Sequence, residues 1–175
     1  FSISYMDNHG FYCPLGHNSD ADKNIPFDKA INMLKELFEH KELTVVGQNF
    51  KYDMNVIKKY SINFKTSIED TMLMSYVLNS GGKHDLGTLA SKFLDHEAIS
   101  YEDVVGKGKD QITFADVDIQ KAVTYACEDS DLTLLVYGKL KSKLLKDKRL
   151  YDVYTNIEIK LMLIIAEMEY LGVSI

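Results

Sequence analysis

The sequence is poor in cysteine, and its apolar residues never form a long run. Only two cysteines, Cys13 and Cys127, occur among 175 residues, and their spacing matches no zinc motif. We expect them to be buried, reduced thiols of a cytoplasmic protein, although a disulfide between them is compatible with the sequence. The longest apolar run, residues 161–166, is far too short to span a bilayer, so no membrane partner is expected.

Positive charge is also scarce. The formal net charge is -6 at pH 7, whereas a protein that grips long duplex DNA through its phosphates alone is usually basic. Any contact with nucleic acid is therefore expected to be short, local and assisted by metal ions. Carboxylates that hold divalent cations would themselves contribute to the negative balance.

The length fits one domain, or one domain with a fragment of the next. The basic, apolar and cleavage regions of a secretory signal do not open the chain. The chain starts at Phe1, within an alternating apolar pattern, and not at a methionine. We therefore expect the natural N-terminus to lie upstream.

The predicted elements are strands first, then strands mixed with helices, then helices alone. Alternation on both sides of a turn at residues 7–10 predicts a β-hairpin, and the β-branched run at residues 43–46 predicts a buried strand. Residues 63–68 are expected to be extended and residues 98–114 to be mostly loop. Helical spacing covers residues 26–38, 51–60, 71–78, 85–94, a long stretch from a cap at Asp116 or Asp118 to about 147, and about 152–171. This order favours an α/β fold with a mixed sheet flanked by helices.

Asp53 ends the segment Gly-Gln-Asn-Phe-Lys-Tyr-Asp at residues 47–53, directly after a predicted buried strand. Open α/β sheets place ligands at the carboxyl ends of their strands, so Asp53 is a candidate metal-associated carboxylate. Gln48 and Asn49 could then hydrogen-bond a nucleotide. The alternative is an acid near a helix N-terminus that is stabilised only by the helix dipole.

A tyrosine and an acid share one face of the long predicted helix. Tyr125 and Asp129 are four residues apart, so the hydroxyl and the carboxylate should point into the same space. Two acids and a phenol at one cleft would suit metal-assisted cleavage of a phosphodiester. The alternative is a chance pair on a solvated helix. We expect Asp131 to be a surface residue and Glu128 to be a solvated charge.

Other polar motifs have simpler interpretations. Asp70 is expected to be the N-cap of the helix over residues 71–78. His84 and Asp85 could contact phosphate, but local packing of His84 and helix capping by Asp85 are favoured. The segment Gly-Lys-Gly-Lys at residues 106–109 lacks the Gly-Lys-Ser/Thr ending of a P-loop and is expected to be a solvated turn.

Taken together, the motifs resemble the 3′-5′ proofreading exonuclease domain of bacterial DNA polymerase I over essentially the whole chain. Five segments occur in the order of that family: residues 47–53, 70–79 (Asp-Thr-Met-Leu-Met-Ser-Tyr-Val-Leu-Asn), 83–86 (Lys-His-Asp-Leu), 106–109 and 125–129 (Tyr-Ala-Cys-Glu-Asp). Each string alone is weak, but five in register are specific. Residues 156–159 and 169–173 are similar to the junction where the family's polymerase domain begins. We expect an exonuclease-like domain at residues 1–150 and the start of a polymerase domain at residues 151–175.

The resemblance implies a ribonuclease H-like fold and two-metal hydrolysis of the terminal phosphodiester of a single-stranded DNA 3′ end. The metals would be Mg²⁺ or Mn²⁺. By this match, Asp53 and Asp129 are metal ligands, and Tyr125 orients the attacking water.

The resemblance also implies a set of DNA contacts. Gln48, Asn49, Tyr52 and Tyr101 fall at or near positions that line the single-stranded DNA cleft of the family. Lys83 stands where the family often has arginine, and lysine keeps the charge but loses the bidentate grip on phosphate.

One part of the family pattern is not found. The family's first motif, Asp-x-Glu, lies on a strand and supplies two more metal ligands, but residues 1–10 contain no such motif. We therefore expect the first strand to be missing and residues 1–175 alone to be inactive, although the second and third motifs are intact. Two alternatives remain: a vestigial, non-catalytic module that braces a polymerase, and an RNA-trimming exonuclease of the same fold.

Overall fold

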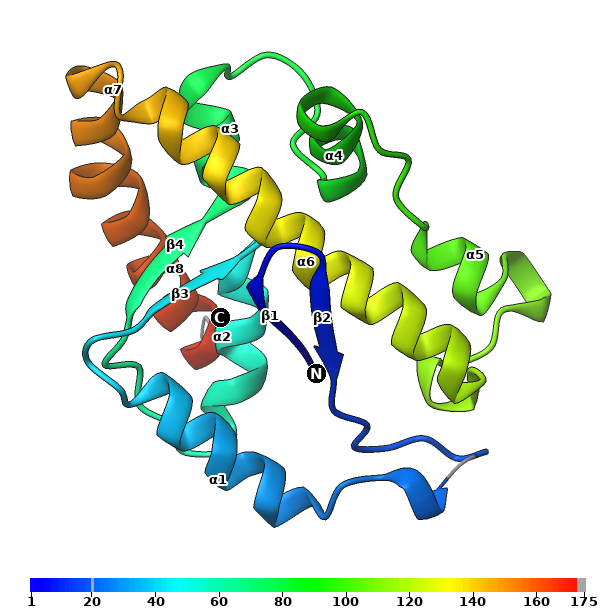
Figure 1. The fold of residues 1–175 in the computed structure, drawn as a ribbon. Coiled ribbons are helices and arrows are strands. Elements are labelled where there is room, and N and C mark those ends of the chain that lie inside the picture. The colour runs from blue at the N-terminus through cyan, green and yellow to red at the C-terminus, as the bar shows by residue number, and fades with distance from the viewer. Residues whose placement is uncertain (20, 173–175) are drawn as a thin grey trace. The chain divides into compact units, whose positions relative to one another are not determined.

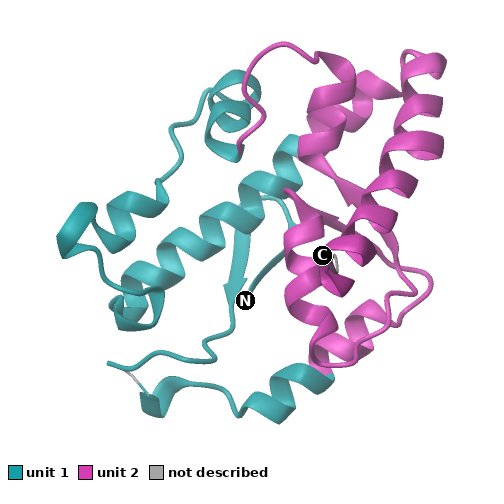
Figure 2. Cartoon of the chain, turned by 180° about the vertical axis from the view of Figure 1, so that it is seen from behind, with its two compact units in different colours: residues 1–32, 86–136 teal, residues 33–85, 137–175 magenta. Residues whose placement is uncertain are grey.

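The computed structural model describes residues 1–19 and 21–172. The chain forms two compact units, one of residues 1–32 and 86–136 and the other of residues 33–85 with the segment from Tyr137 onward (Figure 2). Helices α1 (Phe27–Phe38) and α6 (Ile119–Leu144) each contribute residues to both units. Each unit combines helices with a two-stranded sheet, one antiparallel and one parallel, which confirms the predicted α/β class.

The first unit contains the predicted hairpin, which packs on α6 (Figure 1). Strands β1 (Ser2–Met6) and β2 (His9–Tyr12) are antiparallel, and Asn8 takes a left-handed φ of 63° in the turn. Gly10 lies so close to α6 that a Cβ there would come within 2.6 Å of the Cys127 Cβ. The other elements of this unit are η1 (Ala21–Lys23), α4 (Leu86–Leu94), α5 (Tyr101–Val105), η2 (Gly108–Asp110) and η3 (Phe114–Asp116). A core cluster of the unit is formed by Val104, Val105, Val117 and Ala122.

The second unit contains a parallel β-α-β arrangement. Strand β3 (Thr44–Gly47) pairs in parallel with β4 (Ser67–Asp70), and helix α2 (Phe50–Lys58) connects them, because parallel strands require a crossover connection. Helix α3 (Thr71–Leu78) follows β4 directly. The unit is completed by α7 (Lys148–Val153), the π-helical turn η4 (Tyr154–Glu158) and α8 (Ile159–Leu171).

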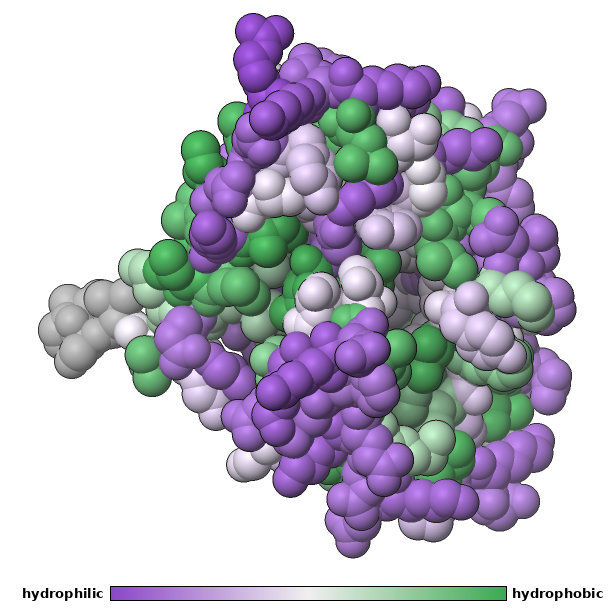
Figure 3. Space-filling view, turned by 60° about the vertical axis from the view of Figure 1, so that its left-hand side comes forward, coloured by the Kyte–Doolittle hydropathy of each residue, from purple (hydrophilic) through white to green (hydrophobic). Residues whose placement is uncertain are grey.

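Helix α8 packs against α2. Its inner face carries the buried residues Met162 and Ala166, while Glu169 pairs with Lys51 at 2.5 Å and Glu167 pairs with Lys58. Another face of α8 is apolar but exposed, with Ile157, Leu161, Ile164, Met168 and Leu171 at helical spacing from the end of η4 onward. Apolar side chains interrupt the hydrophilic surface on the side of the molecule where α8 lies (Figure 3).

A buried tyrosine ties the end of the chain to strand β4. Tyr154 is completely buried, and its hydroxyl donates to Glu69 Oε2 at 2.6 Å and accepts from the Asp70 N–H at 2.9 Å. Glu69 also pairs with Lys141 of α6. Residues beyond 150 therefore complete the core of the second unit.

Three details differ from the sequence predictions. Helix α5 occupies part of the expected loop, and a capping box explains it: the Ser100 Oγ accepts from the Asp103 N–H, and the Asp103 carboxylate accepts from the Ser100 N–H. The expected strand at residues 63–68 is found slightly later, as β4. The final helix is divided, because η4 interrupts the α-helical hydrogen bonds at Tyr154.

Other predictions are confirmed. Asp70 is the N-cap of α3, and Asp118 accepts from the N–H groups of the first turn of α6. Cys13 and Cys127 are free thiols. Within the part of the chain that the structure describes, no helix combines the length and the apolar character needed to cross a membrane. The predicted segment at residues 169–173 ends at Val173, which lies outside the described residues.

Candidate functional site

Asp53 is presented by a tight turn between β3 and α2. Gly47 is buried at the end of β3, and a Cβ there would clash with the Phe50 ring at 2.4 Å. Asn49, the N-cap residue of α2, has a left-handed backbone with φ 60° and ψ 49°, which asparagine tolerates better than most residues. Helix α2 therefore starts immediately after the strand, and Asp53 lies in its first turn.

Asp70 stabilises the same turn from the adjacent strand. Its carboxylate is buried and accepts from the Phe50 N–H at 2.7 Å and from the Leu73 N–H at 3.1 Å, so one side chain joins the first turns of α2 and α3. Burial raises the pKa of Asp70, although these N–H donors oppose the shift. Asp70 is therefore a structural acid, as the sequence predicted.

The Asp53 carboxyl has an unusual protonation equilibrium. Its side chain keeps exposed surface, but neighbouring protein atoms crowd the carboxylate and remove part of its hydration. This desolvation raises the pKa of Asp53 to about 6, and the negative charge of Asp70 adds to the rise. A carboxylate held in this way would gain from a nearby cation.

The predicted DNA-contacting residues of the second unit lie around this turn. Gln48 uses both ends of its amide internally, because its Nε2 donates to the His84 carbonyl at 2.7 Å and its Oε1 accepts from Thr71 Oγ1. The backbone beside Lys83 is thereby joined to the end of β3. Tyr52 is 68% exposed. A small cavity of about 150 Å³ opens beside Asn49, between α2, α3 and α8.

Tyr125 and Asp129 form a hydrogen-bonded pair on α6, as their spacing predicted. Both side chains are half-buried. Burial raises the pKa of the Tyr125 hydroxyl, and the negative charge of Asp129 and the hydrogen bond to it raise it further. Burial also raises the pKa of Asp129, while the Tyr125 hydroxyl opposes this shift by donating to the carboxylate. The phenol is therefore a neutral donor around pH 7.

Aromatic rings surround the Tyr125 side chain. Tyr101 on α5 is stacked on Phe114, with ring centroids 6.2 Å apart and planes inclined by 12°. Tyr125 meets both rings, at centroid distances of 6.2 Å from Tyr101 and 6.1 Å from Phe114. Tyr101, predicted to line a DNA cleft, thus lies beside the Tyr125–Asp129 pair. Phe114 was not predicted, because nothing in its local sequence indicates a ring partner in a distant segment.

Two acids beside the pair are not the solvated charges that the sequence suggested. Glu128 accepts from the Ile99 N–H at 2.7 Å and pairs with His96 Nε2 at 2.8 Å. Asp131 accepts from the Asn8 N–H at 2.7 Å and so fastens the hairpin turn to α6. These partners are 29 to 123 residues away in the sequence, so helical spacing alone could not reveal them.

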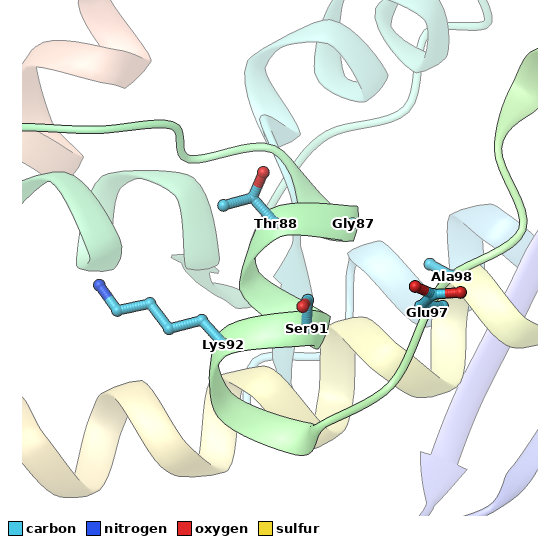
Figure 4. Close-up of a pocket in the computed structure, with 6 residues that line it drawn as sticks. All are labelled: Gly87, Thr88, Ser91, Lys92, Glu97 and Ala98. Atoms are coloured by element: carbon cyan, nitrogen blue, oxygen red, sulfur yellow. The ribbon is translucent and has the colours of Figure 1, made fainter.

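The two predicted metal ligands belong to different units, Asp53 to the second and Asp129 to the first. Among the described residues, no group of three or more histidine, cysteine, aspartate or glutamate side chains is arranged as a metal site. A wide cavity of about 570 Å³ lies in the first unit beside α4. Thr88, Ser91 and Lys92 of α4 face it, with Glu97 and Ala98 of the following loop across from them (Figure 4).

Comparison with known proteins agrees with this arrangement. Residues 1–145 match the family model described as 3′-5′ exonuclease. The chain is 39% identical, over its whole length, to a DNA polymerase I of Rhizobium leguminosarum, and 38% identical, over 98% of its length, to one of Pseudomonas aeruginosa. It is 25% identical, over 99% of its length, to a DNA polymerase of Escherichia phage T5. The chain spans only 19% to 21% of the length of these relatives. It belongs to the 3′-5′ exonuclease domain family of DNA polymerases related to DNA polymerase I.

Proposed function

We propose that this chain acts within a DNA polymerase and hydrolyses the terminal phosphodiester at the 3′ end of single-stranded DNA. The observation that carries the proposal is the Tyr125–Asp129 pair: a neutral phenol donates to a half-buried carboxylate next to exposed aromatic surface. Family membership supports the same reaction, because residues 1–145 match a 3′-5′ exonuclease model.

The donor chemistry of the two candidate ligands fits a hard divalent cation. Asp53 and Asp129 both have a raised pKa, chiefly because burial disfavours their charged forms. A bound cation would compensate for this, and Mg²⁺ and Mn²⁺ prefer carboxylate oxygens. When bound, such ions supply electrostatic stabilisation to a phosphate under attack and to its leaving oxygen. Asp53 and Asp129 are the residues of this chain that would hold them.

The other side chains would bind and orient the substrate. The Tyr125 hydroxyl, kept protonated by its surroundings, can hold a water molecule beside Asp129 in line with the phosphate. Tyr101 and Tyr52 have exposed rings on which bases can stack. Asn49, Gln48 and Lys83 lie at or near the turn that presents Asp53, and Lys83 can contact a phosphate.

The domain assignment remains part of the proposal. Residues 1–150 would be the exonuclease domain, and residues 151–175 would lead into a polymerase domain of the same polypeptide. The first 145 residues coincide with the family model, which supports the boundary. The burial of Tyr154 adds that the connecting segment also contributes to the exonuclease core.

A nuclease assay tests the proposal. We expect residues 1–175 alone to degrade single-stranded DNA poorly, because they carry only two of the four acids that the family uses. A longer form that carries an Asp-x-Glu strand ahead of Phe1 should release nucleotides from a 5′-labelled oligonucleotide in an EDTA-sensitive way. In that form Asp129→Asn should reduce the rate by more than about 100-fold, whereas Glu36→Gln, on the exposed part of α1, should not change it.

Two alternatives predict other results in the same assay. A longer form that degrades RNA faster than DNA would be an RNA-trimming exonuclease. A longer form with no metal-dependent activity on either substrate would be a non-catalytic module that braces the polymerase. Robust EDTA-sensitive hydrolysis by residues 1–175 alone would contradict the need for the missing acids.

A further inference from the structure

We propose that Glu128 is a positioning residue, which fastens the loop before α5 to α6 and thereby holds the Tyr101 ring where a terminal DNA base can stack. The inference rests on the proposed function, because it assigns Tyr101 to the bound strand. It adds a residue inside the Tyr-x-x-x-Asp segment whose task is separate from those of Tyr125 and Asp129.

Both carboxylate oxygens of Glu128 are engaged by the loop. Oε2 accepts from the Ile99 N–H at 2.7 Å, and Oε1 lies 2.8 Å from His96 Nε2. The Glu128 side chain is only 18% exposed, whereas that of His96 is 45% exposed. A hydrogen bond from a backbone amide to a charged acceptor is among the stronger interactions in proteins. The bond from Ile99 is thus the main attachment of the loop.

The attachment is passed to Tyr101 through a short and rigid connection. Ile99 is followed by Ser100, the N-cap of α5, and Tyr101 is the first residue of that helix. The capping box between Ser100 and Asp103 fixes the backbone at this point. Only one residue separates the anchored amide from Tyr101, so a shift of the loop would move the ring with it.

The position of Tyr101 matters because it is part of a ring cluster and also reaches solvent. It stacks on Phe114 and contacts Tyr125, yet 47% of its surface is exposed. A ring that is supported on one side and open on the other is suited to stacking with a base. The hydroxyl of Tyr125 next to it belongs to the catalytic pair, so a base on Tyr101 would lie close to the reacting end.

A direct role of Glu128 in binding DNA is disfavoured by its charge. A carboxylate repels phosphate, and both oxygens already have partners in the loop. If Glu128 assists DNA binding, the effect must therefore pass through the loop and Tyr101. This reasoning distinguishes a positioning role from an electrostatic one, because the two roles predict opposite effects of removing the charge.

The test is the affinity of residues 1–175 for a fluorescein-labelled single-stranded oligothymidylate, measured by anisotropy in EDTA. Tyr101→Leu should weaken binding by roughly 5- to 150-fold, the range for loss of one stacked base. Glu128→Ala should weaken it by about threefold or more, whereas Glu128→Gln, which keeps an acceptor for the Ile99 N–H, should stay within about twofold of wild type. The double variant Glu128→Ala/Tyr101→Leu should bind no more weakly than Tyr101→Leu alone.

The matched control is Glu97→Ala, which removes the same charge from an exposed site in the same loop. Its affinity should equal that of wild type or exceed it slightly. A second measurement guards against misfolding: nuclear Overhauser contacts between the Tyr101 and Tyr125 rings should be lost in Glu128→Ala and kept in Glu128→Gln, while contacts between Gly10 and Cys127 persist in both.

The outcomes separate the two levels of the argument. Tighter binding by both Glu128 variants would show an electrostatic role and overturn the inference. Equal binding by wild type and Glu128→Ala, together with weakened binding by Tyr101→Leu, would overturn it while leaving the proposed function intact. Failure of wild type to bind single-stranded DNA would overturn the proposed function and this inference with it.

Discussion

Replacing Tyr154 by phenylalanine removes a single oxygen atom from the interior of the second unit. That oxygen donates to Glu69 Oε2 and accepts from the Asp70 N–H, and the side chain is completely buried. Without it, the Asp70 amide is buried without an acceptor and Glu69 retains only Lys141. An unsatisfied buried donor costs about 1–3 kcal/mol, and a hydrogen bond to a charged group contributes about 1.5–3 kcal/mol. Because the two terms overlap, we expect a net loss of about 2–4 kcal/mol in the free energy of unfolding.

The assay is urea unfolding of residues 1–175 followed by far-ultraviolet circular dichroism. For a chain of this size, the expected loss lowers the melting temperature by roughly 5–12 °C. Tyr5→Phe is the control, because Tyr5 is 73% exposed and its hydroxyl can be hydrated by solvent. A Tyr154→Phe protein within about 0.5 kcal/mol of wild type would refute the reasoning, since changes of that size are usual for surface substitutions.

Three further results are expected. The pKa of Asp53 is about 6 in the folded chain against a model value of 3.8, so wild type loses stability as the pH rises between those values; Asp53→Asn should escape this loss and be the more stable protein at pH 7 but not at pH 3, as chemical denaturation can measure. Gly10→Ala forces a Cβ against Cys127 and should destabilise by about 1–3 kcal/mol, whereas Gly16→Ala, with nothing within 4 Å, should not. Ser100→Ala removes the capping box of α5 and should lower the unfolding free energy by about 1 kcal/mol, and amide exchange that is unchanged in α5 would contradict this.

Local patterns predicted most of the fold. Helices α1, α2, α3 and α4 begin and end close to the predicted residues, because apolar spacing and capping are properties of neighbouring residues. Helix α5 was overlooked because five residues show no period, although the Ser-x-x-Asp at residues 100–103 is the signal of a capping box. The π-helical turn η4 was also not predicted, since a single turn of this kind leaves the apolar pattern almost unchanged.

Contacts between distant segments account for what the sequence could not reveal. The pairing of Tyr125 with Asp129 was predicted, because both lie on one helix face. The partners of Glu128 and Tyr154 could not be predicted, since Ile99 is 29 residues from Glu128 and Glu69 is 85 residues from Tyr154. The raised pKa of Asp53 depends on crowding by side chains and on Asp70, which only the folded arrangement brings near it.

The π-helical turn η4 makes the end of this chain tolerant of exchanges but intolerant of changes in length. In it the Ile159 N–H bonds to the Tyr154 carbonyl, five residues back, so the turn holds one residue more than an ordinary α-turn. Deleting one residue there would restore a regular helix but rotate everything after it by about 100°. Met162 and Ala166 would then leave their seat on α2. Over evolutionary time, a homologue that gained or lost one residue here would have to rebuild the whole seam between α8 and α2, while single exchanges could accumulate one at a time.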